Sequence, residues 1–137
     1  MHHPERLTKL FVFGANYNPS GVNNAPSVVG DLYFARAGKE YAELSSTPKE
    51  FKSLLTQMGS MWSTQPHWTK TDFANVTTPT WIVDADHDET VKHDQPGTLA
   101  DWVPNAGLLI EPDVSHFAFI QNAEQFNADV LRFLKTK

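Results

Sequence analysis

Residues 80–89 have the sequence Thr80-Trp81-Ile82-Val83-Asp84-Ala85-Asp86-His87-Asp88-Glu89. The first four are β-branched or aromatic, which predicts a buried strand. Four acidic residues and a histidine follow, so we expect the strand to end there and a loop to begin. In open α/β sheets, chemistry takes place in the loops beyond the carboxyl ends of the strands. This stretch therefore predicts both a strand and part of a functional site.

A later stretch repeats the pattern with a histidine. Leu108-Leu109-Ile110 predicts another strand, and Pro112-Asp113-Val114-Ser115-His116-Phe117 follows it. If the two strands are parallel neighbours, their carboxyl ends lie at the same edge of the sheet. One strand then delivers a carboxylate, and the next delivers a histidine to the same place.

The region between residues 14 and 79 has helical character. A helix is expected near 28–43, and a second one follows Thr47-Pro48-Lys49-Glu50, which has the pattern of a capping box. The second helix carries an apolar stripe at helical spacing, formed by Phe51, Leu54, Leu55 and Met58. This stripe either packs on the protein's own core or covers a substrate pocket, since pockets are lined mainly by apolar and aromatic side chains.

The order of the elements predicts the fold class. A buried strand is expected near 8–13, a helix over about 96–103, and a closing helix that Asn122 caps with Gln125 three residues later. Strand, excursion, strand, helix, strand, helix predicts an α/β fold with a three-stranded, mostly parallel sheet and right-handed crossovers. The excursion is too long for one crossover helix, so we expect an inserted helical cap.

Composition limits the class of protein. The chain has 137 residues, 40% of them hydrophobic and 20% charged, which predicts one globular domain. The net charge of −5 without a basic cluster argues against nucleic acid and anionic membranes as partners. Cysteine is absent, which excludes disulfides and cysteine nucleophiles. No apolar run approaches the roughly 18 residues of a membrane helix, and no signal peptide is evident, so a cytoplasmic location is expected.

Several other chemistries could use the acidic loop. Asp84, Asp86 and Asp88 match the first ligands of a calcium loop, but Glu89 stands where glycine is required and Gln95 where glutamate is required. The Asp-x-Asp pair also resembles the haloacid-dehalogenase phosphatases, yet no adjacent Asp-Asp pair follows. A transition-metal site of His87 and His93 with Asp88 has no favourable ligand spacing. We therefore predict no metal and no cofactor, and expect Asp84, Asp86 and Glu89 individually to belong to a solvated loop.

Taken in order, several segments resemble the C-terminal part of the α/β-hydrolase superfamily, from its sixth strand to its end. The family pattern has an apolar strand, Gly-x-x-Asp, a helix with a Pro-x-Ala turn, a second strand, a histidine loop and a closing helix. The matching segments are Pro79 to Val83, Ala85 to Asp88, Val103 to Ala106, Leu108 to Ile110, Ser115 to Phe117, and Phe126 to Leu134. Pro4 to Gly14 resembles the sixth strand. The resemblance implies a partial α/β-hydrolase domain, with core residues 1–21 and 76–137 and a cap over 22–75.

The resemblance also implies catalytic roles. Asp88 takes the place of the catalytic acid, with Asp86 as the alternative that matches less well, and His116 takes that of the base. Ala85 departs from the usual glycine. The physical chemistry agrees, because a carboxylate that accepts the imidazole Nδ1–H fixes the tautomer and supports the imidazolium. The other ring nitrogen is then free to take a proton.

The nucleophile of the family is absent from this sequence. It normally precedes the acid on a Gly-x-Ser-x-Gly turn, and Ser20, Ser60 and Ser115 all lack the flanking glycines. We expect the C-terminal part of an esterase-like hydrolase for a small apolar substrate, inactive as an isolated chain. The alternative is a non-catalytic association module. Both hypotheses predict an unpaired sheet edge at strand 8–13, and hence a homo-oligomer or a complementing N-terminal half as partner.

Overall fold

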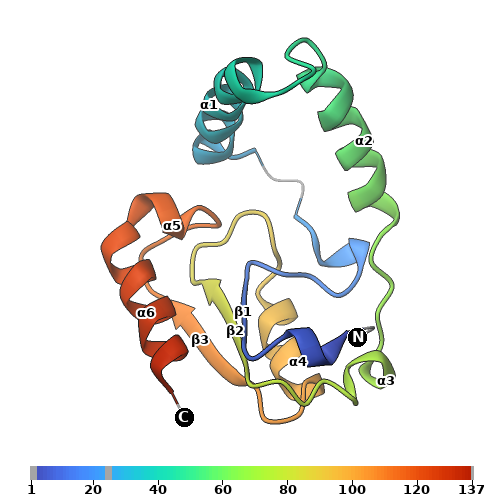
Figure 1. Ribbon diagram of the computed structural model, residues 1–137, viewed down its shortest axis with the longest axis vertical. Helices are drawn as coiled ribbons and strands as arrows, with labels where there is room; N and C mark the ends of the chain where they lie inside the picture. Colours follow the sequence, from blue (N-terminus) through green and yellow to red (C-terminus); the bar gives the residue numbers. More distant parts are fainter. Residues whose placement is uncertain (1–2, 24–25, 137) are drawn as a thin grey trace.

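Three parallel strands form the sheet, as the sequence predicts (Figure 1). The computed structural model describes residues 3–23 and 26–136. In space the strands lie in chain order, namely β1 (Leu10–Phe13), β2 (Thr80–Ala85) and β3 (Gly107–Glu111). Both strand pairs are parallel, with Phe13 opposite Val83 and Val83 opposite Leu109. The predicted α/β class is confirmed, and the carboxyl ends of the three strands share one edge.

The helices differ from the expected ones mainly at their ends. They are α1 (Val28–Leu44), α2 (Phe51–Thr64), α3 (Lys70–Phe73), α4 (Asp94–Trp102), α5 (Ala118–Gln121) and α6 (Ala123–Lys135). Two 3-10 turns, η1 (Pro4–Arg6) and η2 (Pro19–Gly21), flank β1. The short helices α3 and α5 were not predicted. None of the helices within residues 3–23 and 26–136 is long and apolar enough to cross a membrane.

One predicted helix cap is wrong and another is confirmed. Helix α2 begins at Phe51, so its N-cap is Glu50 and not Thr47, and Glu50 makes no side-chain cap bond. The Thr47 hydroxyl instead bonds the Tyr41 hydroxyl at 2.8 Å across the α1–α2 turn. At α6, the Asn122 side chain accepts from the Gln125 amide at 3.4 Å, as predicted. The two cases differ because Asn122 directly precedes its helix, whereas Thr47 lies in the turn before α2 and bonds a residue of α1.

Aromatic side chains join the sheet to α6. Phe126 packs edge-on against Phe13 with ring centroids 5.1 Å apart, and Phe133 lies 5.1 Å from Trp81. Phe133 is 1% exposed, so this contact is a centre of the core. Burying such a side chain contributes roughly 1.5–3 kcal/mol. Through Phe126 and Phe133, the closing helix that the sequence predicts therefore packs against β1 and β2.

Strand β1 begins at Leu10, later than the expected residue 8, because its pairing with β2 starts at Leu10 and Thr80. The residue before it, Lys9, contacts the end of α6. The Lys9 Nζ donates to the carbonyl oxygens of Phe133 at 3.0 Å and of Leu134 at 2.8 Å. The last carbonyls of a helix lack partners within the helix and favour a nearby cation. This contact fixes the two ends of the described chain against each other.

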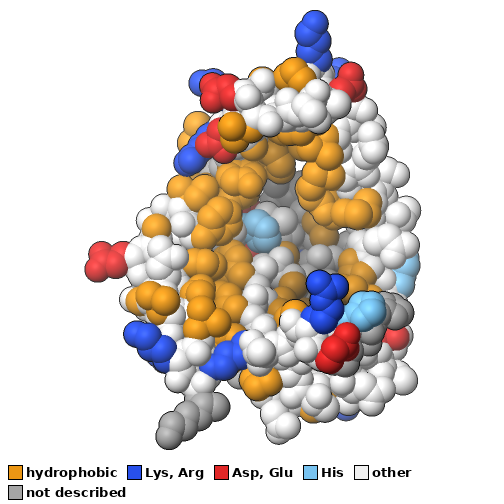
Figure 2. Space-filling model, viewed as in Figure 1, with side chains coloured by type: hydrophobic (Ala, Val, Ile, Leu, Met, Phe, Trp, Pro, Cys, Tyr) orange, Lys and Arg blue, Asp and Glu red, His pale blue; other side chains and the backbone are white. Residues whose placement is uncertain are grey.

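Helices α1 and α2 form an arm, residues 28–64, that stands over the carboxyl edge of the sheet (Figure 1). The rings of Tyr41 and Phe51 lie 5.5 Å apart where the two helices meet. Figure 2 shows a hollow beneath the arm with hydrophobic side chains on both of its sides. The predicted core ranges 1–21 and 76–137 and cap 22–75 include residues 1, 2, 24, 25 and 137, which lie outside the described residues. The division into core and cap stays a prediction.

Candidate active site

The Asp88 carboxylate is buried and held in a fixed orientation by two backbone amides and one imidazole nitrogen. It follows β2, is 3% exposed, and its Oδ1 accepts from the amides of Thr90 at 2.7 Å and Val91 at 2.6 Å. Its other oxygen, Oδ2, lies 2.8 Å from the Nδ1 of His116. The loop itself is anchored, because Val91 forms an antiparallel bridge with Val22. The carboxylate can therefore receive the Nδ1–H of an imidazole in one geometry.

His116 follows β3 and sits between aromatic rings. The rings of Phe13 and Phe117 lie 6.2 Å and 5.5 Å from the imidazole, and the side chain is 25% exposed. Gly14 leaves room for it, since a Cβ at Gly14 would lie 2.7 Å from the His116 Cε1. Gly14 also has a φ of +59°, which favours glycine. Within residues 3–23 and 26–136, the His116 Nε2 has no hydrogen-bond partner and is free to act.

Asp84 is the site residue that sequence reasoning missed. We expected it in a solvated loop, but it is the fifth residue of β2 and is 2% exposed. Burial, a hydrogen bond with Asp88 and the Asp88 charge together raise the pKa of Asp84 to about 8. Near neutral pH, Asp84 is then mostly a carboxylic acid that donates to Asp88. The signal in the sequence is the position of Asp84 directly after the apolar run Trp81 to Val83, where a residue still belongs to the buried strand.

The pKa of Asp88 is lowered despite burial. Burial is the largest effect and by itself raises this pKa, but hydrogen bonds from His116, Asp84 and the Val91 amide outweigh it, with the His116 charge adding to them. Asp88 is thus held as the carboxylate while Asp84 holds the proton. The two carboxyl groups differ in role because their partners differ.

A cavity of about 480 Å³ adjoins His116 beneath the arm. Its lining contains five aromatic side chains and no Lys, Arg, Asp or Glu; the residues are Gly14, Asn16, Val22, Tyr33, Phe34, Met58, Trp62, Thr90, Val91, His116, Phe117 and Phe119. Met58 belongs to the apolar stripe predicted on the second helix, and it faces this cavity. Such a lining favours uncharged, apolar or aromatic groups.

Comparisons with known proteins rest on structure. No protein-family model matches the sequence, and no curated protein matches it. A meta-cleavage product hydrolase from Pseudomonas fluorescens IP01 is 18% identical with a TM-score of 0.74, and covers 97% of this chain and 57% of its own. A serine hydrolase involved in carbazole degradation is 19% identical with a TM-score of 0.68, covering 99% and 57%. The chain has part of an α/β-hydrolase fold.

The α/β-hydrolase fold is also matched by an enzyme from the metagenome of lagoon sediments at Mar Chica, Morocco. It is 20% identical with a TM-score of 0.61, and the match covers 98% of this chain and 52% of that one. This chain thus spans between half and three fifths of the length of these structures. The predicted partial α/β-hydrolase fold is confirmed, while the catalytic roles of Asp88 and His116 stay predictions.

The other two acidic residues of the loop after β2, Asp86 and Glu89, lie in different surroundings. Glu89 is half-buried and bonded rather than solvated, because its carboxylate accepts from Ser27 and from the His116 amide. Asp86 is half-buried, with its Oδ1 buried and without a hydrogen-bond partner, while His87 and Asp113 are exposed; ligand atoms of these three lie within 4.8 Å of one another. The alternative metal set of His87, His93 and Asp88 is not brought together within residues 3–23 and 26–136. Asp88, and not Asp86, is the carboxylate that pairs with the imidazole of His116.

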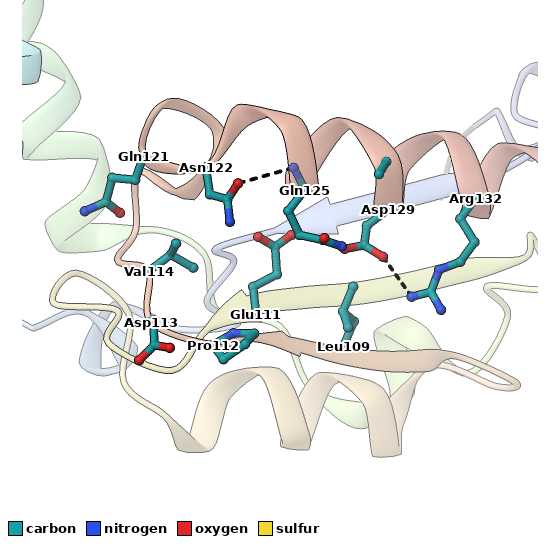
Figure 3. Close-up of a pocket in the computed structure, with 11 residues that line it drawn as sticks. Leu109, Glu111, Pro112, Asp113, Val114, Gln121, Asn122, Gln125, Asp129 and Arg132 are labelled. Carbon is teal, nitrogen blue, oxygen red and sulfur yellow. Dashed lines mark hydrogen bonds and ion pairs between the residues drawn. The ribbon is translucent and has the colours of Figure 1, made fainter.

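A larger cavity of about 800 Å³ lies elsewhere in the fold, between β3 and α6 (Figure 3). It is lined by Glu111, Gln125, Asp129 and Arg132, among others, and contains neither Asp88 nor His116. The Oε1 of Glu111 is buried without a hydrogen-bond partner. The smaller, aromatic cavity is the one beside the paired carboxylate and imidazole, so the candidate active site lies there.

Proposed function

We propose that this chain supplies the acid and the base of an esterase-like hydrolase that acts on small apolar substrates. Asp88 is the acid, His116 is the base, and the nucleophile comes from a segment outside this sequence. The supporting observation is the 2.8 Å contact between the Asp88 Oδ2 and the His116 Nδ1 beside an aromatic cavity. A carboxylate and an imidazole whose second ring nitrogen is free correspond to two of the three groups of a catalytic triad.

The chemistry follows from these positions. Asp88 accepts the Nδ1–H, which leaves the Nε2 lone pair of His116 facing the cavity. This nitrogen takes the proton of the nucleophile's hydroxyl as its oxygen bonds the ester carbonyl carbon. The imidazolium then gives that proton to the leaving alcohol, and water repeats the sequence to release the acid. Asp88 stabilises the imidazolium throughout, and the hydrogen bond from Asp84 keeps Asp88 ionised.

The test combines this chain with a nucleophile-bearing half. The upstream coding sequence, expressed in frame with this chain, is expected to hydrolyse p-nitrophenyl butyrate, whereas the chain alone is not. His116→Ala and Asp88→Ala are each expected to lower kcat by about 10³-fold or more. Asp86→Ala is the matched control and should leave kcat within about threefold. Equal activity in the His116→Ala protein would refute the proposal.

A non-catalytic association module is the second candidate, and the free edge of β1 favours it. The Leu10 amide donates to Pro79 at 2.9 Å and the Gly14 amide to Val83 at 3.0 Å, so the amides of Phe11 and Phe13 point away from β2. Within the part of the chain that the structure describes, no strand pairs with them. An unpaired edge of this kind recruits another strand, from a second copy or from a complementing half.

Hydrogen exchange of the backbone amides of β1 tests whether the chain self-associates through this free edge. In a dimer joined at β1, the Phe11 and Phe13 amides become protected as the protein concentration rises. The Leu10 and Gly14 amides serve as internal controls because β2 protects them already. Light scattering gives the mass in the same samples. A monomeric mass with constant exchange at Phe11 and Phe13 would rule out self-association through this edge.

A further inference from the structure

Glu89 joins two segments that are far apart in the chain. It lies in the loop after β2, and its Oε1 accepts from the Ser27 hydroxyl at 2.5 Å. Its Oε2 accepts from the backbone amide of His116 at 3.1 Å. One carboxylate therefore bridges residue 27, at the start of the arm, and residue 116, in the loop after β3.

The bridge continues into the first turn of α1. Ser27 is the N-cap of this helix, and its Oγ accepts from the Gly30 amide at 2.8 Å while its proton goes to Glu89. A capping residue fixes where a helix begins and the direction in which it starts. Three linked hydrogen bonds thus run from the Gly30 amide through Ser27 and Glu89 to the His116 amide.

Aromatic packing joins the same two segments independently. Tyr33 of α1 lies 4.9 Å from the ring of Phe117, the residue after His116, and 6.3 Å from Phe119 of α5. In Figure 1 the first turns of α1 stand next to α5. Tyr33, Phe117 and Phe119 also line the cavity beside His116. A shift of α1 relative to the His116 loop would therefore change both the cavity and these contacts.

The bridge needs Glu89 as a carboxylate, because both of its oxygens accept hydrogen bonds. Burial is the largest effect on the pKa of Glu89 and raises it, as does the Asp88 charge. The bonds from Ser27 and from backbone amides, including that of His116, outweigh both and lower this pKa. Glu89 is therefore ionised at neutral pH and accepts charge-assisted hydrogen bonds, which are stronger than neutral ones.

We infer that Glu89 is a positioning residue, which ties the start of α1 to the backbone of His116 so that the arm and the imidazole keep one relative geometry. This role of Glu89 rests on the proposed function, because it requires that the imidazole of His116 takes part in the reaction. Glu89 touches neither the imidazole nor the substrate cavity, and acts through the main chain of His116. Glu89 thereby fixes the position of the α1 side of the cavity relative to the imidazole of His116.

Amide exchange and histidine NMR test this inference without turnover. Glu89→Ala is expected to speed exchange of the His116 amide about 10-fold or more, and to broaden or split the His116 imidazole signals. Ser27→Ala leaves Glu89 in place, yet it should speed exchange at both Gly30 and His116 and perturb the same imidazole signals. Ser27→Thr retains the hydroxyl and should restore the wild-type spectrum. Glu43→Ala, an exposed change on the same helix, is the matched control.

Two results would overturn the inference. Ser27→Ala could leave the His116 amide and imidazole unchanged, or Glu89→Ala could leave the Gly30 amide unchanged; either outcome means that the arm and the base are not coupled. In the combined, active protein, Glu89→Ala should lower kcat more than it changes KM. If His116→Ala retains activity while the NMR coupling is present, the proposed function fails and the bridge stands. The two failures are therefore distinguishable.

Discussion

Asp88 and Glu111 are equally buried, but they differ in their hydrogen-bond partners and in the direction of their pKa shifts. Each lies at or just beyond the carboxyl end of a strand, Asp88 after β2 and Glu111 at the end of β3, and each is 3% exposed. Asp88 accepts from two amides and pairs with His116, whereas the Glu111 Oε1 has no partner. The pKa of Asp88 is lowered, and that of Glu111 is raised by burial and by the charge of Asp129.

The difference shows that burial alone does not mark a functional carboxylate. A buried charge is costly unless hydrogen bonds replace the lost water, and the fold provides these for Asp88. Around Glu111, the neighbouring polar groups are engaged with one another. Figure 3 shows Asp129 paired with Arg132, at 2.9 Å, beside the Glu111 side chain. Partner geometry, more than exposure, identifies the candidate active site.

The largest expected effect is the loss of Asp88. Asp88→Ala removes the acceptor of the Thr90 and Val91 amides and of the His116 imidazole, which leaves the buried Val91 amide and the half-buried Thr90 amide and imidazole without this partner. Each such group costs about 1–3 kcal/mol. We expect the free energy of unfolding, measured by urea denaturation at pH 7, to fall by about 3–5 kcal/mol. Asp101→Ala, an exposed change on α4, should cost less than about 0.5 kcal/mol. A loss no larger than that control would break the comparison.

The second prediction concerns pH and Asp84. The folded pKa of about 8 is above the unfolded value of 3.8, so the folded state retains a proton that the unfolded state has released. The contribution of Asp84 is therefore complete below about pH 4 and is lost as pH rises towards about 8. Asp84→Asn cannot titrate, and its amide still donates to Asp88. We expect this variant to be the more stable protein at pH 9 and close to wild type at pH 4.

Unfolding curves between pH 4 and pH 9 measure this difference. The gap between Asp84→Asn and wild type should widen with pH, by no more than about 1.4 kcal/mol per pH unit. Asp31→Asn, in the first turn of α1, provides an exposed control whose gap should stay small. A gap that is constant across this range would mean that Asp84 is ionised in the folded protein and does not donate to Asp88.

Much of the fold could be predicted because the sequences of β2 and β3 contain short apolar runs that are followed directly by polar residues. The pairing of Asp88 with His116 followed from parallel strands whose carboxyl ends meet. The resemblance supplied the choice of Asp88 over Asp86, and hydrogen-bond geometry agrees with it. These inferences concern residues that are close in the chain or lie on adjacent strands, where the spacing in the sequence determines which residues are neighbours.

The remainder depends on contacts that no spacing encodes. The strand was expected to reach Asp84, and it does, but the burial of the Asp84 side chain and its hydrogen bond with Asp88 depend on how the loop after β2 folds. The Ser27–Glu89 bond spans the whole arm. Thr47 begins a capping-box pattern, but its hydroxyl forms a hydrogen bond with the Tyr41 hydroxyl of α1. In each case a tertiary partner decided between two locally acceptable conformations.

The smallest effect is expected at Glu111, with the opposite sign to that at Asp88. Glu111→Gln removes a carboxyl group whose pKa is raised, and supplies an amide that can donate to Asp129 across the cavity of Figure 3. Ionisation of Glu111 costs stability as pH rises above its ordinary pKa of 4.5, so the gain should be absent at pH 4 and present at pH 7. One added hydrogen bond and the loss of a like charge contribute about 0.5–1.5 kcal/mol. Glu124→Gln, an exposed change at the start of α6, should give no such gain. If Glu111→Gln instead destabilised the protein at pH 7 as strongly as Asp88→Ala, Glu111 would be a partnered carboxylate, and the contrast between the two strand ends would be false.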